Sequence, residues 1–137
     1  MIKMLVVEDS QDDLFLLMLA LKKLKLDLNV DTVNDGDAAI AYFENTAIAR
    51  PKFIFLDLHL PKRSGFEVIS WIRQHPDLKN LPIVVLTSSN EPQDLQRAYD
   101  LGANGYLVKP GLLEQLDEIV RSSTDFWLRY NQTPTMA

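Results

Sequence analysis

The fold is decided by the segment Phe53-Ile54-Phe55-Leu56-Asp57-Leu58-His59-Leu60-Pro61. Its first four residues are aromatic or branched apolar residues, a pattern typical of a strand that is buried on both faces. Asp57 follows directly, and the chain then turns at Pro61, with Gly65 close behind. Open α/β sheets place their reactive groups at the carboxyl ends of the central strands. Asp57 is therefore the first candidate for a functional residue.

A second apolar run, Met4-Leu5-Val6-Val7, also ends in acids, Glu8 and Asp9. If both runs lie in one parallel sheet, their carboxyl ends meet at the same edge, and three carboxylates share a pocket. Carboxylates that share a pocket repel one another and need a cation, for which a hard ion such as Mg²⁺ is the best match. A nucleophilic carboxylate beside Mg²⁺ is the arrangement that forms an aspartyl phosphate.

Strands and helices are predicted to alternate along the whole chain. Apolar runs predict strands at 2–7, 29–33, 53–58, 83–87 and 105–109, and helices are predicted at about 11–25, 37–45, 65–74, 92–101 and 112–130. Ser10 and Ser64 are placed to cap two of these helices, and Gly102 is placed to end a third. Five such units predict an α/β fold, in which helices cover both faces of a doubly wound, five-stranded parallel sheet. We expect one domain over 1–130 and a flexible tail over 131–137.

Composition argues against several classes of function. The chain has 137 residues, a formal net charge of −5 and no cysteine. The negative charge argues against nucleic acid and anionic membrane surfaces as partners, and the lack of cysteine excludes disulfides and cysteine-ligated zinc. The chain has no apolar stretch long enough to span a membrane and no secretory signal. We therefore expect a cytoplasmic protein that binds neither nucleic acid nor membrane.

Four predicted strands deliver polar residues to one edge of the sheet: Glu8-Asp9, Asp57, Thr87 and Lys109. Together with the segments Val85-Leu86-Thr87-Ser88, Gly102-Ala103-Asn104-Gly105-Tyr106 and Lys109-Pro110, these motifs resemble the receiver domain of two-component response regulators, up to about residue 128. The resemblance implies the flavodoxin-like (βα)5 fold. It also implies a protein that is not an enzyme in the usual sense, because it accepts a phosphoryl group from a histidine kinase on its own Asp57 and removes it only slowly.

The resemblance assigns the metal ligands. Asp9 and Asp57 are expected to bind Mg²⁺ directly, together with the backbone carbonyl of His59, and Glu8 is expected to reach the ion through a water molecule. The ion would neutralise phosphate oxygens during transfer.

The resemblance also assigns the residues around the phosphate. Lys109 is expected to bind a phosphate oxygen as a point charge, and Thr87 to hydrogen-bond the phosphate once it forms. Tyr106 is the expected aromatic switch, which turns inward as Thr87 moves. Pro110 suggests a cis peptide bond that would aim the lysine side chain.

Two further positions are expected to tune the lifetime of the phosphate. His59 lies two residues after Asp57, and Ser89 lies two residues after Thr87. In this family, such side chains flank the path of the hydrolytic water. The sequence leaves open whether His59 orders that water or blocks it, or is an exposed imidazole without a role.

The last predicted helix ends in Phe126-Trp127-Leu128-Arg129-Tyr130. Consecutive large side chains point in different directions around a helix, so they cannot all enter one core. Phe126 and Trp127 are therefore expected in an interface, although Trp127 is also placed to cover the core. This ending and the segment 75–89 resemble the single-domain regulators that pair with cyanobacterial phytochromes.

The resemblance to those regulators implies partners. We expect a sensor histidine kinase of the phytochrome type, and a homodimer formed through the fourth helix, the fifth strand and the fifth helix. No second domain follows, so we expect a stand-alone receiver that signals by phosphorylation-dependent contact between proteins.

Three rival interpretations fit the sequence less well. A phosphatase of the haloacid dehalogenase type needs a second acid two residues after its nucleophile, where this chain has His59. A flavodoxin or dinucleotide-binding domain needs a phosphate-cradling loop after the first strand, where Glu8-Asp9-Ser10 would repel phosphate. A degenerate receiver that serves only as a scaffold would lack the acceptor, an acid or the lysine, and this chain has all of them.

Overall fold

Five parallel strands form the centre of the protein. The computed structural model describes residues 2–134. The strands are β1 (Ile2–Val7), β2 (Leu28–Val33), β3 (Ile54–Leu56), β4 (Ile83–Thr87) and β5 (Gly105–Val108). They pair in the order β2-β1-β3-β4-β5, and every pair is parallel. The predicted α/β fold with a doubly wound sheet is confirmed.

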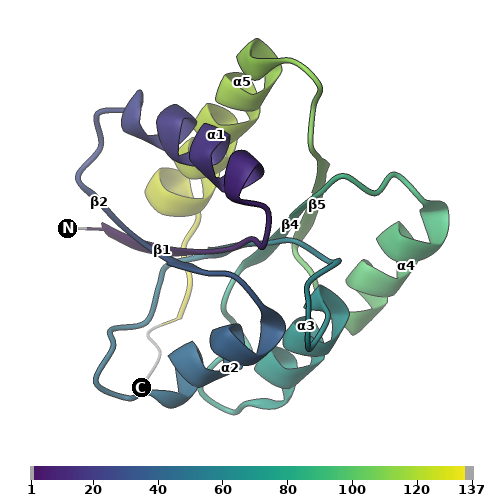
Figure 1. The fold of residues 1–137 in the computed structure, drawn as a ribbon. Helices are drawn as coiled ribbons and strands as arrows, with labels where there is room; N and C mark the ends of the chain where they lie inside the picture. Colours follow the sequence, from purple (N-terminus) through teal and green to yellow (C-terminus); the bar gives the residue numbers. More distant parts are fainter. Residues whose placement is uncertain (1, 135–137) are drawn as a thin grey trace.

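Helices cover both faces of the sheet, as Figure 1 shows. One face carries α1 (Gln11–Lys22) and α5 (Leu113–Thr124), and the other carries α2 (Gly36–Glu44), α3 (Gly65–Gln74) and α4 (Pro92–Leu101). A separate hydrophobic core lies on each face, because strand residues point alternately to one side and the other. No helix within residues 2–134 is long and apolar enough to cross a membrane.

Local signals fix the helix ends. The Ser10 hydroxyl accepts a hydrogen bond from the Asp13 amide at 3.2 Å and caps α1. Ser64 and Glu67 form a reciprocal capping box at the start of α3. The chain leaves α4 through Gly102, whose φ of 116° is in the left-handed region that favours glycine.

The predicted long final helix changes its geometry near its end. Thr124 is buried, and its hydroxyl donates to the Val120 carbonyl at 2.8 Å. The chain then continues as a π-helical segment, Asp125–Tyr130. Within it, Trp127 packs against the core at partial burial, whereas Phe126 is 51% exposed.

The end of the chain is described only in part. Residues 131–134 form neither helix nor strand, and the rest of the predicted flexible tail, residues 135–137, lies outside the described residues.

Arg73, at the end of α3, ties two distant loops together. Its Nε donates to the Gly102 carbonyl at 2.9 Å, and its Nη1 donates to the Leu81 carbonyl at 2.8 Å. Its Nη2 donates to the Asn104 side chain at 2.7 Å. The guanidinium therefore joins the segment before β4 to the turn between α4 and β5.

Candidate functional site

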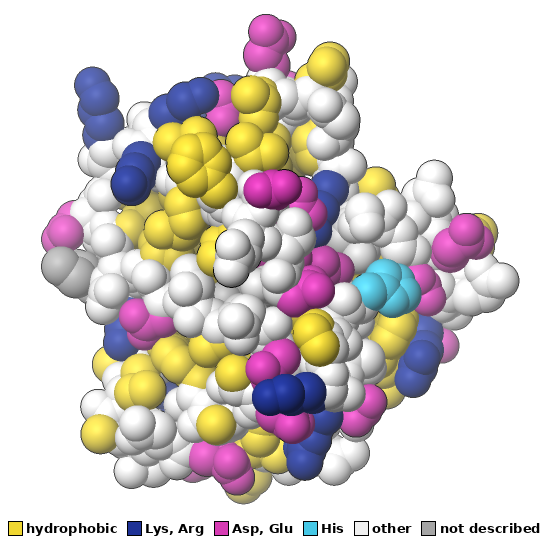
Figure 2. Space-filling model, in the orientation of Figure 1, with side chains coloured by type: hydrophobic (Ala, Val, Ile, Leu, Met, Phe, Trp, Pro, Cys, Tyr) yellow, Lys and Arg dark blue, Asp and Glu magenta, His cyan; other side chains and the backbone are white. Residues whose placement is uncertain are grey.

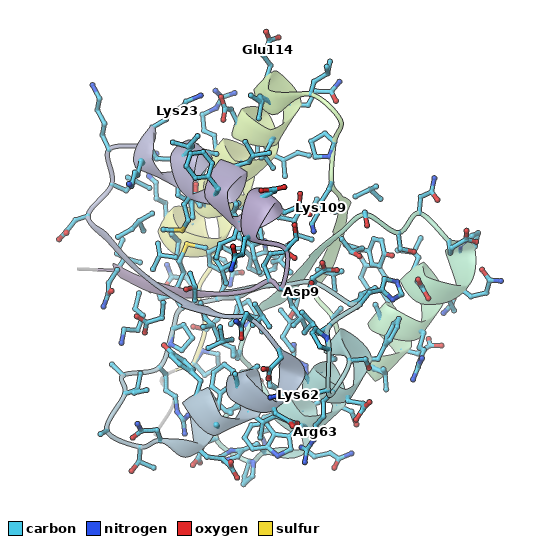
Figure 3. The ribbon with its side chains drawn as sticks, in the orientation of Figure 1. Asp9, Lys23, Lys62, Arg63, Lys109 and Glu114 are labelled. Carbon is cyan, nitrogen blue, oxygen red and sulfur yellow. The ribbon has the colours of Figure 1, made fainter. Side chains whose placement is uncertain are left out.

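The carboxyl edge of the sheet brings together the three predicted acids. Glu8 and Asp9 follow β1 and Asp57 follows β3, and these two strands end level because Val7 pairs with Leu56. One carboxylate oxygen from each acid lies within 4.8 Å of the other two. Figure 3 shows Asp9 at this edge, and Figure 2 shows acidic side chains gathered near the centre of the same face.

Lys109 places a positive charge among these acids. Its Nζ lies 2.6 Å from Glu8 Oε1 and 3.1 Å from Asp57 Oδ2. A third carboxylate, that of Asp13 in the first turn of α1, lies 2.9 Å from the same nitrogen. Figure 3 shows Lys109 beside that turn. Sequence reasoning missed Asp13 as a contact of Lys109, because an acid in the first turn of a helix is explained by the helix dipole alone.

The prediction of a cis bond before Pro110 is wrong. None of the peptide bonds within residues 2–134 is cis. The Lys109 amide donates to the Thr87 carbonyl at 2.7 Å, so the backbone pairing of β5 with β4 continues up to the proline. Lys109 already reaches Asp57 with the trans bond, which is also the intrinsically preferred form.

Burial and Lys109 set the ionisation of the site. The side chains of Glu8 and Asp57 are only 5% and 9% exposed. Burial raises the pKa of Glu8 to about 7, although the hydrogen bonds to Lys109 and the Ser10 amide oppose the shift. Burial alone would raise the pKa of Asp57 too, but the charge and hydrogen bond of Lys109, with the hydroxyl of Thr87, hold that pKa below its usual value. Asp57 is therefore a charged carboxylate at neutral pH, as a nucleophile requires.

Thr87 and Tyr106 meet through the backbone of Ser89. Thr87 is fully buried at the end of β4, and its Oγ1 accepts a hydrogen bond from the Ser89 amide at 3.4 Å. The Tyr106 hydroxyl donates to the Ser89 carbonyl at 3.0 Å. A rearrangement of Thr87 that moves Ser89 would thus change the hydrogen bond of Tyr106, as the expected switch requires.

His59 and Ser89 are joined by a residue that sequence reasoning did not single out. His59 Nε2 and Ser89 Oγ lie 3.1 Å and 2.7 Å from the same oxygen of Asp94, in the first turn of α4. The hydrogen bond from Ser89 is the main cause that lowers the pKa of Asp94; burial opposes it, and the hydrogen bond from His59 lowers the pKa further. No sequence signal distinguished Asp94 from an ordinary acid in the first turn of a helix.

The donor set fits a divalent metal. Three carboxylates that converge at one edge, two of them buried, are the oxygen ligands that hard cations prefer. The backbone of His59 adjoins this group, since its amide donates to Asp57 Oδ1 at 3.4 Å. An open pocket of about 360 Å³ borders Glu8 and Asp9.

The fold and this site define a class of protein. Residues 4–121 match the family of response regulator receiver domains, and the chain belongs to this family, which is not a family of enzymes. The chain is therefore a protein of two-component signalling, in which the partner of a response regulator is a histidine kinase.

Two regulators illustrate the range of similar proteins. Response regulator Rcp1 of Synechocystis is 42% identical over 130 residues, which cover 90% of this chain and 87% of Rcp1. The probable methanogenesis regulatory protein FilR2 of Methanothrix harundinacea is 38% identical over 133 residues, which cover 95% of this chain and 86% of FilR2.

Solved structures agree with this placement. The Mn²⁺-bound form of Rcp1 superposes with a TM-score of 0.89 at 39% identity, covering 98% of this chain and 100% of Rcp1. The phosphorylated cyanobacterial phytochrome response regulator RcpA also gives 0.89 at 39% identity, covering 97% of this chain and 98% of RcpA.

Proposed function

We propose that this protein is a response regulator that takes a phosphoryl group from a histidine kinase onto Asp57, with Mg²⁺ as its cofactor. The observation that carries the proposal is the position of Asp57, a buried and charged carboxylate that lies beside Lys109 and shares a cluster with two further acids. In the transfer, an Asp57 oxygen forms a bond to phosphorus as the phosphorus–nitrogen bond of the kinase phosphohistidine breaks.

The other residues bind and orient the groups that react. Asp9, Asp57 and the carbonyl of His59 would hold Mg²⁺ directly, and Glu8 would hold it through water. When bound, the ion neutralises the oxygens of the transferred group. Lys109, which contacts Asp57 at 3.1 Å before transfer, would contact a phosphate oxygen afterwards.

Thr87 and Tyr106 would report the phosphate to the surface. The buried hydroxyl of Thr87 would turn to the phosphate and change the environment of Ser89, which is hydrogen-bonded to both residues. Tyr106 would then lose or alter its hydrogen bond to the Ser89 carbonyl. A shift between two such states needs a free-energy difference of only a few kcal/mol.

Intact mass spectrometry tests this function. The protein is incubated with a small-molecule phosphodonor and Mg²⁺, with Asp57→Asn and Asp12→Asn as variants. We expect one added phosphoryl group on the wild type and on Asp12→Asn, whose acid is exposed in the first turn of α1, and none on Asp57→Asn. Stable phosphate on Asp57→Asn would refute the assignment of the acceptor.

The kinase is proposed to be of the phytochrome type. The support is the similarity to RcpA, a phytochrome response regulator, across nearly the whole chain. Phosphotransfer from purified sensor kinases measures this directly, and we expect transfer from a cyanobacterial phytochrome kinase to be faster than from an unrelated kinase. Equal rates from both would remove this part of the proposal.

We also propose that the protein forms a homodimer through α4, β5 and α5. These elements, with Leu112 at the start of α5, carry a set of exposed apolar side chains along the edge strand of the sheet: Leu95, Tyr99, Val108, Leu112 and Leu113. Sedimentation analysis of Leu113→Ser should show weaker self-association than the wild type. Phe15→Ser, which changes a similarly exposed apolar residue on α1, is the matched control.

Phe126 and Trp127 would extend this interface at the end of the last helix. Trp127→Ala is expected to weaken self-association, and Phe126→Ala provides the comparison for a more exposed side chain. Because Trp127 also packs on the core, the thermal stability of the Trp127→Ala variant must be measured as well as its sedimentation profile. An unchanged profile with lowered stability would assign Trp127 to the core alone.

A further inference from the structure

Three side chains form a bridge beside the acidic site. Asp94 Oδ2 accepts a hydrogen bond from Ser89 Oγ at 2.7 Å, and it lies 3.1 Å from His59 Nε2. A charged carboxylate only accepts hydrogen bonds, so Nε2 of the imidazole is the donor in this contact. The bridge therefore joins the loop after β3, the loop after β4 and the first turn of α4.

Both ends of the bridge are next to the atoms that react. The His59 amide donates to Asp57 Oδ1 at 3.4 Å, and the Ser89 amide donates to Thr87 Oγ1 at 3.4 Å. His59 and Ser89 thus occupy corresponding positions, each two residues beyond a group that contacts the phosphate. Asp94 closes the gap between them on the side of the site that faces α4.

Neighbouring groups hold the bridge in place. The imidazole of His59 packs edge-on against the ring of Phe66, with centroids 6.5 Å apart, and Arg97 lies over that ring at 4.1 Å. The Ser89 carbonyl accepts a hydrogen bond from Tyr106 at 3.0 Å. The His59 side chain is nevertheless 59% exposed, and its ring contacts Asp94 and Phe66.

We propose that Asp94 is a positioning residue that prolongs the life of the phosphorylated state. By holding His59 and Ser89 across the gap between the two loops, it limits the approach of water to phosphorylated Asp57. Hydrolysis forms a bond from the water oxygen to phosphorus and breaks the bond from phosphorus to Asp57, so the carboxylate and inorganic phosphate are released. This inference rests on the proposed function of Asp57. Of the two roles that the sequence left open for His59, it assigns the blocking of water rather than the ordering of water.

The test measures how fast the phosphoryl group is lost after the phosphodonor is removed in the presence of Mg²⁺, by intact mass. We expect Asp94→Ala to lose it about fivefold faster than the wild type, the rate factor that corresponds to one ordinary hydrogen bond. Asp94→Asn should stay within about twofold of the wild type, because its amide oxygen can accept the hydrogen bonds from both Ser89 and His59 that Asp94 Oδ2 accepts. Asp100→Ala, which removes an exposed acid from the same helix, is the matched control and should decay at the wild-type rate.

A double-mutant comparison shows whether Asp94 acts through its partners. In a background that carries both His59→Ala and Ser89→Ala, Asp94→Ala should accelerate the decay no further. An equal acceleration in that background would overturn the inference.

Each remaining result has a defined meaning. A wild-type rate for Asp94→Ala, in a wild type that does become phosphorylated, would overturn this inference and leave the proposed function standing. Equal acceleration in Asp94→Ala and Asp94→Asn would trace the effect to charge and also overturn the bridge. A wild type that gains no phosphoryl group would overturn the proposed function and this inference with it.

Discussion

Replacing Lys109 with Met tests the electrostatic account of the site. Methionine keeps most of the length of the side chain but removes the ammonium group that lies within 3.1 Å of Glu8, Asp13 and Asp57. Two of these carboxylates are almost completely buried and would then face each other without a cation. The variant should therefore be less stable than the wild type when no metal is present.

The size of the loss follows from burial. Removing one partner of a buried ion pair costs roughly 3–5 kcal/mol. Glu8 can relieve part of this cost by taking up a proton, because its pKa is already raised to about 7. We therefore expect the lower end of that range, about 3 kcal/mol at pH 8, which lowers the unfolding midpoint of a domain of this size by about 10 °C.

Thermal and urea unfolding in the presence of a chelator measure this loss. Lys23→Met is the matched control, since Lys23 contacts Asp117 at 2.7 Å but is 65% exposed, and an exposed pair contributes no more than about 1 kcal/mol. Added Mg²⁺ should narrow the gap between Lys109→Met and the wild type, because the ion replaces the missing positive charge and binds the variant more tightly. A variant as stable as the wild type at pH 8, or a gap that Mg²⁺ leaves unchanged, would refute the reasoning.

Three further predictions concern pH and the scaffold. The affinity for Mg²⁺ should rise as the pH increases through about 7, because Glu8 must lose its proton before its charge can attract the ion, and Glu8→Gln should flatten this dependence in a calorimetric titration. Arg73→Met should lower the free energy of unfolding, measured in urea, by about 3 kcal/mol, because it leaves several carbonyl oxygens without their donor. Arg129→Met, which removes an exposed ion pair with Asp125, is the control and should leave the urea midpoint within error of the wild type. Gly102→Ala should cost about 1–2 kcal/mol in the same assay, because φ is 116° there and an added Cβ would lie 2.8 Å from Arg73 Cγ.

The sequence was sufficient to predict the elements and the acids at their ends. The bounds of β1, β4 and α4 agree with the prediction because each combines an apolar run or helical period with a clear stop, such as Gly102 after α4. The convergence of Asp57 with Glu8 and Asp9 follows from parallel pairing alone, since strands in register end at one edge.

Features that depend on how helices sit on the sheet were not predictable. Asp13 and Asp94 are both first-turn acids, and only the packing of α1 and α4 brings one to Lys109 and the other to His59. The π-helical segment after α5 likewise has no sequence signal, because the residues from 112 to 130 follow a helical pattern that does not distinguish a π-helical turn from an α-helical one.

The attachment of α4 has a mechanical consequence. Ala98 is the one residue of this helix that is fully buried, so the helix contributes few side chains to the core. The carboxyl end of α4 is anchored, because Arg73 donates a hydrogen bond to the carbonyl of Gly102, which follows the helix. Its amino end is held by the contacts of the Asp94 side chain with His59 and Ser89, by the hydrogen bond from the Glu91 amide to Ser89 Oγ, and by Arg97 over the Phe66 ring. If the contacts at the amino end were broken, α4 could rotate about Gly102. The exposed Leu95, near the free end, would then move farther than residues close to Gly102.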